Sequence, residues 1–282
     1  ITVNPTPVID DVSEAICTGG TFTTVEPQDG NGQIVPSGTT YTWGVSGDGV
    51  VTGGSANTTG SSTIPGQELV NSTSSPATLT YNVTATSAGD CTGTFDIIIT
   101  VNPTPVIDDV SEAICTGGTF TTVEPQDGNG QIVPSGTTYT WGVSGDGVVT
   151  GGSANTTGSS TIPGQELVNS TSSPATLTYN VTATSAEGCI GTFDITITVN
   201  PLGQVNQPDD IVVCNQELTT IDFETLNSGG ATSYTWVVTG DAVGLSSSTS
   251  SVEDSINDIT FTAVNETTDT LTATIEVTPI FE

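Results

Sequence analysis

Five cysteines are the side chains of this sequence best suited to covalent chemistry. Cys17 and Cys115 occupy one position of an internal repeat with an offset of 98 residues, and Cys91 and Cys189 occupy another. No second Cys or His lies within a few residues of any of them, so the spacing is not that of a metal site. One pair of cysteines per repeat predicts the disulfides Cys17–Cys91 and Cys115–Cys189, with free thiols as the alternative.

A fifth cysteine, Cys214, stands in a third and more diverged copy of the repeat. Thr267 occupies the place where we expect its partner. Cys214 is therefore predicted to be an unpaired, buried thiol, with an intermolecular disulfide as the alternative.

Pairs of adjacent aspartates follow each joint between repeats and are the candidate metal ligands. Carboxylates gathered at a joint would suit Ca²⁺, which takes six to eight oxygen ligands. Adjacent residues of a strand point to opposite faces, so one pair does not easily supply two ligands, and solvated charge is the alternative. No cofactor is required, and Ca²⁺ is the one candidate. Its candidate ligands are Asp10, Asp11, Asp108, Asp109, Asp209 and Asp210.

One tryptophan recurs in each repeat, at Trp43, Trp141 and Trp236, and each follows a tyrosine two residues earlier. Side chains two apart on a strand share one face, so both rings point the same way. A single Trp on a middle strand is typical of an immunoglobulin-type core. The alternative is an exposed aromatic platform that stacks on sugars.

The charge of the chain excludes several classes of function. It has no Lys, Arg or His, and its 31 acidic residues give a formal charge of −31. Nucleic acids and anionic membranes are bound through cationic side chains, so neither is an expected partner. Acid–base chemistry by histidine and Schiff-base chemistry by lysine are also excluded. A glycosidase needs only two carboxylates, but nearly identical copies offer no chemical advantage to an active site, so we predict that the chain is not an enzyme.

Strands account for the regular structure that the sequence predicts. Segments such as 78–86 and 94–101 are rich in Val, Ile, Thr and aromatic residues, alternate in polarity, and lie between Gly, Pro, Asn and Ser clusters. No window shows a helical apolar period, and no apolar run is long enough to span a membrane. The strands expected in the first copy lie near 9–15, 20–26, 39–46, 62–70, 78–86 and 94–101, with a short one near 49–52.

The repeat sets the domain organisation. Val3-Asn4-Pro5-Thr6-Pro7 recurs as Val101-Asn102-Pro103-Thr104-Pro105, and a period near 100 residues fits one β-sandwich domain per copy. We expect the last strand of an upstream repeat at 1–3, full repeats at 4–101 and 102–199, and a shorter repeat at 200–282 that closes at Val277-Thr278-Pro279. The predicted fold is all-β, with tandem immunoglobulin-like sandwiches in an extended rod.

The pattern AICTGGTF…YTW…LVNSTSSPATLTYNVTATSA…C-x-GTFDI-x-ITVNPTP resembles the PKD-like and immunoglobulin-like repeats of giant secreted surface adhesins of Bacteroidetes-type bacteria. These include gliding-motility adhesins exported by type IX secretion. The resemblance implies an extracellular site on the outer membrane of a Gram-negative cell. It also implies O-glycosylation at Asp-Ser/Thr-aliphatic motifs, which here place the acceptors at Ser255 and Thr270.

The function expected from these observations is that of a non-enzymatic repeat segment in a long cell-surface filament. Such a segment would serve as a stalk and as a multivalent adhesive surface in gliding or attachment. Its partners would be adjacent repeats of the same chain, and surface polysaccharide or an abiotic substratum. The alternatives are a polysaccharide-binding module and a passive spacer in a secreted multidomain enzyme.

Overall fold

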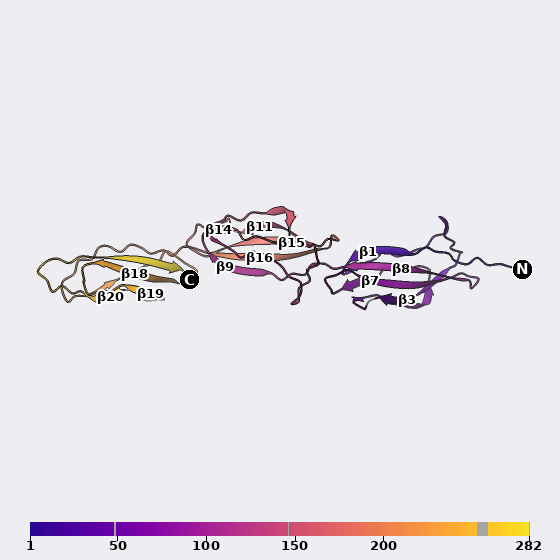
Figure 1. Ribbon diagram of the computed structural model, residues 1–282, viewed down its shortest axis with the longest axis horizontal. Coiled ribbons are helices and arrows are strands. Elements are labelled where there is room, and N and C mark those ends of the chain that lie inside the picture. The colour runs from indigo at the N-terminus through magenta and orange to yellow at the C-terminus, as the bar shows by residue number, and fades with distance from the viewer. Residues whose placement is uncertain (48, 146, 253–258, 282) are drawn as a thin grey trace.

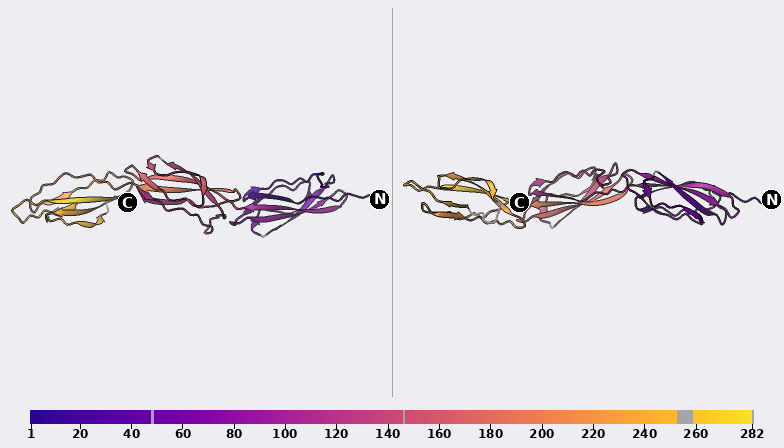
Figure 2. Two further views of the ribbon diagram at one scale, coloured as in Figure 1. Left: turned by 45° about the horizontal axis from the view of Figure 1, so that its top comes forward. Right: turned by 90° about the horizontal axis from the view of Figure 1, so that it is seen from below.

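The computed structural model describes residues 1–47, 49–145, 147–252 and 259–281. Three β-sandwich bodies follow one another end to end along a single long axis (Figure 1). Two further views show the same elongated arrangement (Figure 2). All the secondary-structure elements assigned in the described residues are β-strands, which confirms the predicted tandem all-β fold.

The first repeat is built from two facing sheets. One has the strand order β1-β8-β7-β3-β5, and the other has the order β2-β6-β4. Strand β1 runs parallel to β8, whereas the other paired strands run antiparallel. The strands are β1 (Val12–Cys17), β2 (Gly20–Thr21), β3 (Thr40–Gly47), β4 (Val51–Thr52), β5 (Asn57–Ser61), β6 (Glu68–Asn71), β7 (Ala77–Thr86) and β8 (Thr92–Asn102).

The second repeat has the same architecture, with sheets of order β13-β11-β15-β16-β9 and β10-β14-β12. Its strands are β9 (Val110–Cys115), β10 (Gly118–Thr119), β11 (Thr138–Gly145), β12 (Val149–Thr150), β13 (Asn155–Ser159), β14 (Glu166–Asn169), β15 (Ala175–Thr184) and β16 (Ile190–Asn200).

Alternation along the central strands explains how a chain of such low hydrophobicity builds a core. Strand β7 buries every second residue and turns the others outward. Its fully buried Tyr81 packs against Phe22, which directly follows β2 of the facing sheet, with ring centroids 5.1 Å apart. Burying each large apolar side chain contributes about 1.5–3 kcal/mol, which offsets the disorder that the composition alone favours.

The third body is smaller, and the pairing of its strands shows which strands of the first repeat they correspond to. It contains β17 (Leu218–Ile221), β18 (Thr232–Gly240), β19 (Ser248–Val252), β20 (Ile259–Thr262) and β21 (Ala273–Phe281). Strand β18 pairs with β21, placing Trp236 opposite Val277, as β3 places Trp43 opposite Val83 of β7. Strand β21 is therefore the counterpart of β7, and no counterpart of β8 occurs in the described residues.

This pairing corrects one expectation from the sequence. Val277-Thr278-Pro279 does not correspond to Val101-Asn102-Pro103, because it lies in the counterpart of β7, whereas Val101 and Asn102 lie in β8. Neighbouring antiparallel strands share the same alternating Val and Thr pattern, so the amino-acid sequence alone does not show which of the two strands a segment forms. The end of β21 accordingly runs back toward the second repeat (Figure 1).

Candidate functional site: the joint between repeats

A disulfide joins the first repeat to the second. Cys17, the last residue of β1, is bonded to Cys189, which lies in the loop before β16. Their Cα atoms are 5.7 Å apart although the two cysteines lie 172 positions apart in the chain. The separation of the Cα atoms is one that a disulfide spans, and the cross-link closes the joint between two neighbouring sandwiches.

The predicted pairing within each repeat, Cys17–Cys91 and Cys115–Cys189, is wrong in this structure. Because β1 runs parallel to β8, Cys17 pairs with Asn102 at the end of β8, whereas Cys91 directly precedes its first residue. The 11 residues of β8 at roughly 3.3 Å each keep the two cysteines on the order of 35 Å apart. The parallel pairing of β9 with β16 separates Cys115 from Cys189 in the same way.

The linker holds both halves of the disulfide in place. The amide of Thr18 donates to the carbonyl of Asn102 at 2.8 Å, and Cys189 Sγ lies 3.9 Å from that carbonyl oxygen. A side chain at Gly191 would collide with the carbonyl of Pro105, so the linker backbone packs directly on the hairpin. The hairpin of the second repeat is thereby fixed against the end of the first.

The hairpin loop itself presents Cys189 inward. The Ser185 amide donates to the carbonyl of Cys189 at 2.9 Å, and the Cys189 amide donates to Ser185 Oγ at 3.1 Å. Gly188 takes a φ of +86°, a value that favours glycine at the turn. Cys189 is completely buried at the joint.

A hydrogen bond between side chains also crosses this joint. Ser74 Oγ donates to Asp127 Oδ2 at 2.7 Å, while the other Asp127 oxygen accepts the Val133 amide at 3.0 Å. The hydrogen bond from the Val133 amide, helped by that from Ser74, lowers the pKa of Asp127 below its ordinary value. The ionised carboxylate is therefore the form that holds the contact.

The joint between the second and third repeats is held by hydrogen bonds instead. The Ser228 amide and the Asn227 side chain both donate to the Ser172 carbonyl, at 3.0 and 3.2 Å. The hydroxyls of Ser173 and Ser228 are 2.6 Å apart. Cys115 lies at the end of β9 in the position of Cys17, but it is an exposed thiol.

Cys214 differs from its prediction, because it is exposed and not buried. The residue that we expected to replace its partner has another role. Thr267 donates its amide to Asn265 Oδ1 at 2.9 Å, as Thr73 does to Asn71 Oδ1 at 3.0 Å. Thr267 is thus the counterpart of Thr73 and does not occupy a cysteine position.

A buried asparagine near the joint escaped the sequence analysis. The Asn71 side chain donates to the carbonyls of Ser75 at 2.8 Å and Val101 at 2.9 Å, and so ties the loop after β6 to the end of β8. Asn169 makes the matching bonds in the second repeat. The triplet Asn-x-Thr recurs at this position in all three repeats, and it is a signal for an Asx turn that could have revealed the site.

Comparison with known families decides the identity of these sandwiches. The family model described as the PKD-like domain matches residues 14–105 and 112–203. The chain belongs to the PKD-like domain family. A search of the curated proteins found no match.

Solved structures show some similarity to the whole array of PKD-like repeats. Human CDH23 EC21-23 is 13% identical, with 95% of this chain and 93% of that chain covered and a TM-score of 0.30. Chicken CNTN1 FN1-FN3 is 12% identical, with coverage of 87% and 84% and a TM-score of 0.34. At TM-scores this low, the similarity supports no conclusion about the PKD-like chain.

The tryptophans of the PKD-like repeats point into the sandwiches. Trp43 and Trp141 are each 5% exposed, and their indole N–H groups donate to the carbonyls of Ser55 and Ser153 at 2.9 Å. Trp236 is half-buried and makes the same kind of bond to Ser246 at 3.2 Å. The two buried rings have no open face on which a sugar could stack.

The paired aspartates of the PKD-like repeats are all exposed, and two of them stabilise backbone groups. Asp11 Oδ1 accepts the Asp96 amide at 2.8 Å, and Asp109 does the same for Asp194. Within the described ranges, no three Cys, Asp or Glu side chains gather closely enough to hold a metal ion. A calcium site needs six to eight oxygens around one point, and these carboxylates do not supply them among themselves.

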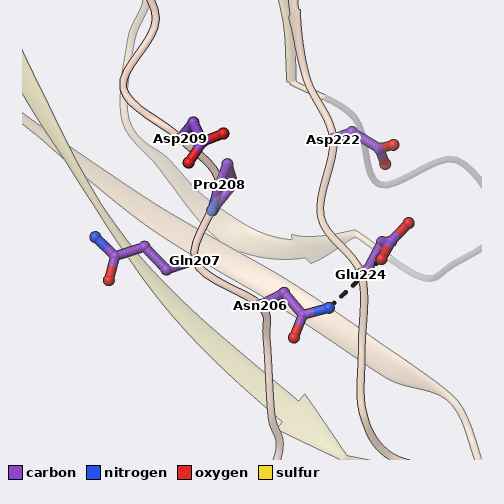
Figure 3. Close-up of a pocket in the computed structure, with 6 residues that line it drawn as sticks. All are labelled: Asn206, Gln207, Pro208, Asp209, Asp222 and Glu224. Carbon is purple, nitrogen blue, oxygen red and sulfur yellow. Dashed lines mark hydrogen bonds between the residues drawn. The ribbon is translucent and has the colours of Figure 1, made fainter.

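An open hollow in the third repeat contains one of the predicted ligands. Asn206 Nδ2 donates to a Glu224 carboxylate oxygen at 3.4 Å across it (Figure 3). The lining residues are Asn206, Gln207, Pro208, Asp209, Asp222 and Glu224. Asp210 does not line this hollow, so the predicted pair is divided between two environments.

Of the two predicted glycosylation acceptors, Thr270 lies on an exposed loop before β21. Ser255 lies outside the described residues. Modification at either position stays a prediction. In the part of the chain that the structure describes, no helix has the length and apolar character needed to cross a membrane.

Proposed function

We propose that this chain is a non-enzymatic stalk segment of an extracellular surface adhesin, with repeats at 4–101, 102–199 and 200–282. The observation that carries the proposal is the disulfide between Cys17 and Cys189, which locks two PKD-like sandwiches end to end. Disulfides form and persist in oxidising surroundings, so a locked joint suits a chain that works outside the cell. The setting is the outer membrane of a Gram-negative cell that attaches or glides.

The charge of the chain supports a stalk that stays extended. Its 31 acidic residues have no cationic residues to neutralise them, so neighbouring repeats and neighbouring filaments repel one another. Adjacent repeats that are nearly identical are prone to pair wrongly while folding, and a common negative charge disfavours such pairing. The composition thus suits a long array in which each sandwich keeps to its own fold.

The placement of the aromatic side chains favours a stalk over a sugar-binding module. The buried rings of Trp43 and Trp141 are part of the cores, where they stabilise the sandwiches. A target such as polysaccharide or an abiotic substratum would instead be contacted weakly and at many points along the array. The primary role proposed for these repeats is to hold the adhesive part of the protein away from the cell.

The experiment replaces residues 4–199, in the organism that makes the chain, by two unrelated, non-adhesive sandwich domains of matching length. A second strain lacks the same residues altogether. For a stalk, we expect the replacement to keep surface attachment and the deletion to weaken it. Loss of attachment in the replaced strain, at normal surface display, would show that the repeats are themselves adhesive. Normal attachment in both strains would overturn any role of this segment in adhesion.

A further inference from the structure

The thiol of Cys91 lies in the same surroundings as the bonded Cys189. Cys91 Sγ is 3.7 Å from the carbonyl oxygen of Asn4, as Cys189 Sγ is 3.9 Å from that of Asn102. The hairpin loop is also the same, since the Ser87 amide donates to the Cys91 carbonyl at 2.9 Å. Cys91 is therefore held at the N-terminal end of its repeat in the geometry of a bonded hairpin cysteine.

The thiol of Cys115 matches the other half of the disulfide. Cys115 pairs with Asn200 at the end of β16, as Cys17 pairs with Asn102 at the end of β8. The next amide, that of Thr116, donates to the Asn200 carbonyl at 2.8 Å, the distance found at the bonded joint. Cys115 is exposed at the C-terminal end of its repeat.

Cys214 is not the partner that a strand-end cysteine such as Cys115 needs. The only cysteine of the third repeat is Cys214. The amide of Gln216 donates to the Ala263 carbonyl as Gly19 donates to Leu69, so Cys214 corresponds to Cys17 and not to a hairpin cysteine. Cys214 and Cys115 are therefore both strand-end cysteines, and Cys115 is free in this structure.

We propose that Cys91 and Cys115 are cross-linking sites for further PKD-like repeats of this type. Cys91 bonds the strand-end cysteine of a repeat on its N-terminal side, and Cys115 bonds the hairpin cysteine of a repeat on its C-terminal side. Each joint between two full repeats is then closed by one disulfide. This assignment does not depend on the proposed function, because it concerns only how repeats of this kind join.

The cross-link forms by ordinary thiol–disulfide exchange with a small disulfide such as oxidised glutathione. The thiolate of one cysteine attacks glutathione disulfide, forming a mixed disulfide and releasing one glutathione thiolate. The thiolate of the second cysteine then displaces the other glutathione. The two protein thiols lose two protons and two electrons, and one glutathione disulfide becomes two glutathione thiols.

The test inserts one extra copy of residues 102–199 between Val199 and Asn200, so that a full repeat follows Cys115. Two exposed substitutions mark the peptides, Ala113→Ser in the original copy and Ile190→Val in the inserted copy. The chain refolds with reduced and oxidised glutathione, and its remaining thiols are alkylated. Because the chain has no Lys or Arg, digestion uses a glutamate-specific protease and chymotrypsin before mass spectrometry.

We expect a cross-linked peptide that carries both marks, beside the peptide that joins Cys17 to Cys189. Replacing Cys115 by Ser in the same chain removes the doubly marked peptide and leaves the other. The proposal is overturned if Cys115 is alkylated while Cys17–Cys189 forms, or if the unmodified chain lacks the Cys17–Cys189 peptide.

A second chain tests Cys91 if the insertion prevents folding. It carries a copy of residues 4–98 ahead of Ile1, with Ala15→Ser as the mark and Cys91→Ser in the added copy, so that the original Cys91 is the one cysteine at that position. The marked strand-end peptide is expected to be linked to the Cys91 peptide. Alkylation of Cys91 in this chain, with Cys17–Cys189 formed, overturns the proposal for the N-terminal side.

Discussion

At the scale of single residues, Asn71 connects the loop after β6 to the strand that leads into the linker. Its amide group satisfies two buried carbonyls, and its oxygen accepts the amide of Thr73. Removing such a side chain leaves buried acceptors without donors, which costs roughly 1–3 kcal/mol.

We therefore expect Asn71→Ala to lower the free energy of unfolding of the first repeat by about 2 kcal/mol. Denaturant titration of the purified chain measures this change. The control is the neighbouring Ser72→Ala, an exposed position where the change should stay within about 0.5 kcal/mol. Equal effects of the two substitutions would contradict the role given to Asn71.

The contact between Ser74 and Asp127 gives the first joint a dependence on pH. Because the folded pKa of Asp127 is lowered, the contact contributes stability that is fully present above the unfolded pKa and is lost as the pH falls through the folded pKa. We expect Ser74→Ala to raise the pKa of Asp127 toward its ordinary value. An NMR titration of the Asp127 carboxyl group in both chains measures this, and identical midpoints would show that Ser74 contributes nothing.

The sequence predicted the placement of a residue well where that placement follows from alternation within one strand. It predicted the role of a residue poorly where that role depends on a contact with another segment. The Tyr and Trp spacing placed Trp43 on an inward face, because alternation is a property of a single strand. Thr267 was misplaced because its role becomes visible only through the bond to Asn265. The Asn-x-Thr triplet is present in every repeat, but its hydrogen bonds to the neighbouring loop and strand become apparent only in the folded structure.

At the scale of elements, the long strands followed closely from the sequence, and the short β4 lies within the predicted segment 49–52. The predicted segments 39–46, 78–86 and 94–101 match β3, β7 and β8. Strand β5 was missed because its residues Asn57–Ser61 have the composition of a turn. It joins the sheet only along β3, with an irregular register.

The direction of β1 decided which cysteines bond, and no pattern in the sequence reports it. One pair of cysteines per period is compatible with bonds within repeats and with bonds between them. Only the parallel pairing of β1 with β8 carries Cys17 to the far end of its sandwich. The sequence repeat therefore shows which cysteines occupy equivalent positions. The direction of the strands determines which of them are close enough to bond.

We expect Cys17→Ser to loosen the first joint without unfolding either sandwich. Because Thr18 and Cys189 both meet the carbonyl of Asn102, losing the bond should speed hydrogen exchange of the Thr18 amide several-fold. Hydrogen exchange followed by mass spectrometry or NMR measures the change. The matched control is Cys115→Ser, at the same position of the next repeat, where no disulfide is lost. Equal exchange in both variants would contradict a role of the disulfide in the joint.

The exposed aspartate pairs at the joints lead to a prediction about calcium. Since their carboxylates do not converge with a third within the described residues, we expect the melting temperature to be the same in Ca²⁺ and in a chelator. Differential scanning calorimetry makes the comparison at fixed ionic strength. A melting temperature that rises with Ca²⁺ and falls on chelation would contradict this.

At the scale of the whole molecule, the chain is a row of sandwiches whose two joints differ. The first joint is covalent, and the second depends on a few hydrogen bonds from Ser228 and Asn227 to the loop at Ser172. Bending should therefore concentrate at the second joint. Among the described residues, the joint closed by a disulfide is therefore the stiffer of the two.

The Cys17–Cys189 disulfide also decides how the molecule responds to tension. A pull on the two ends passes along the chain to Cys17, crosses the sulfur bridge to Cys189, and continues toward the C-terminus, so everything between them is bypassed. Reduction should release the loop closed by the bridge, whose ends are 172 positions apart, and lengthen the fully stretched chain by about 600 Å, at roughly 3.5 Å per position.

Single-molecule stretching with and without a reductant measures this difference in contour length. An equal length in both conditions would show that the two repeats do carry the load. If the bridge bypasses residues 18–188, the covalent joint limits how far tension can extend this part of the chain.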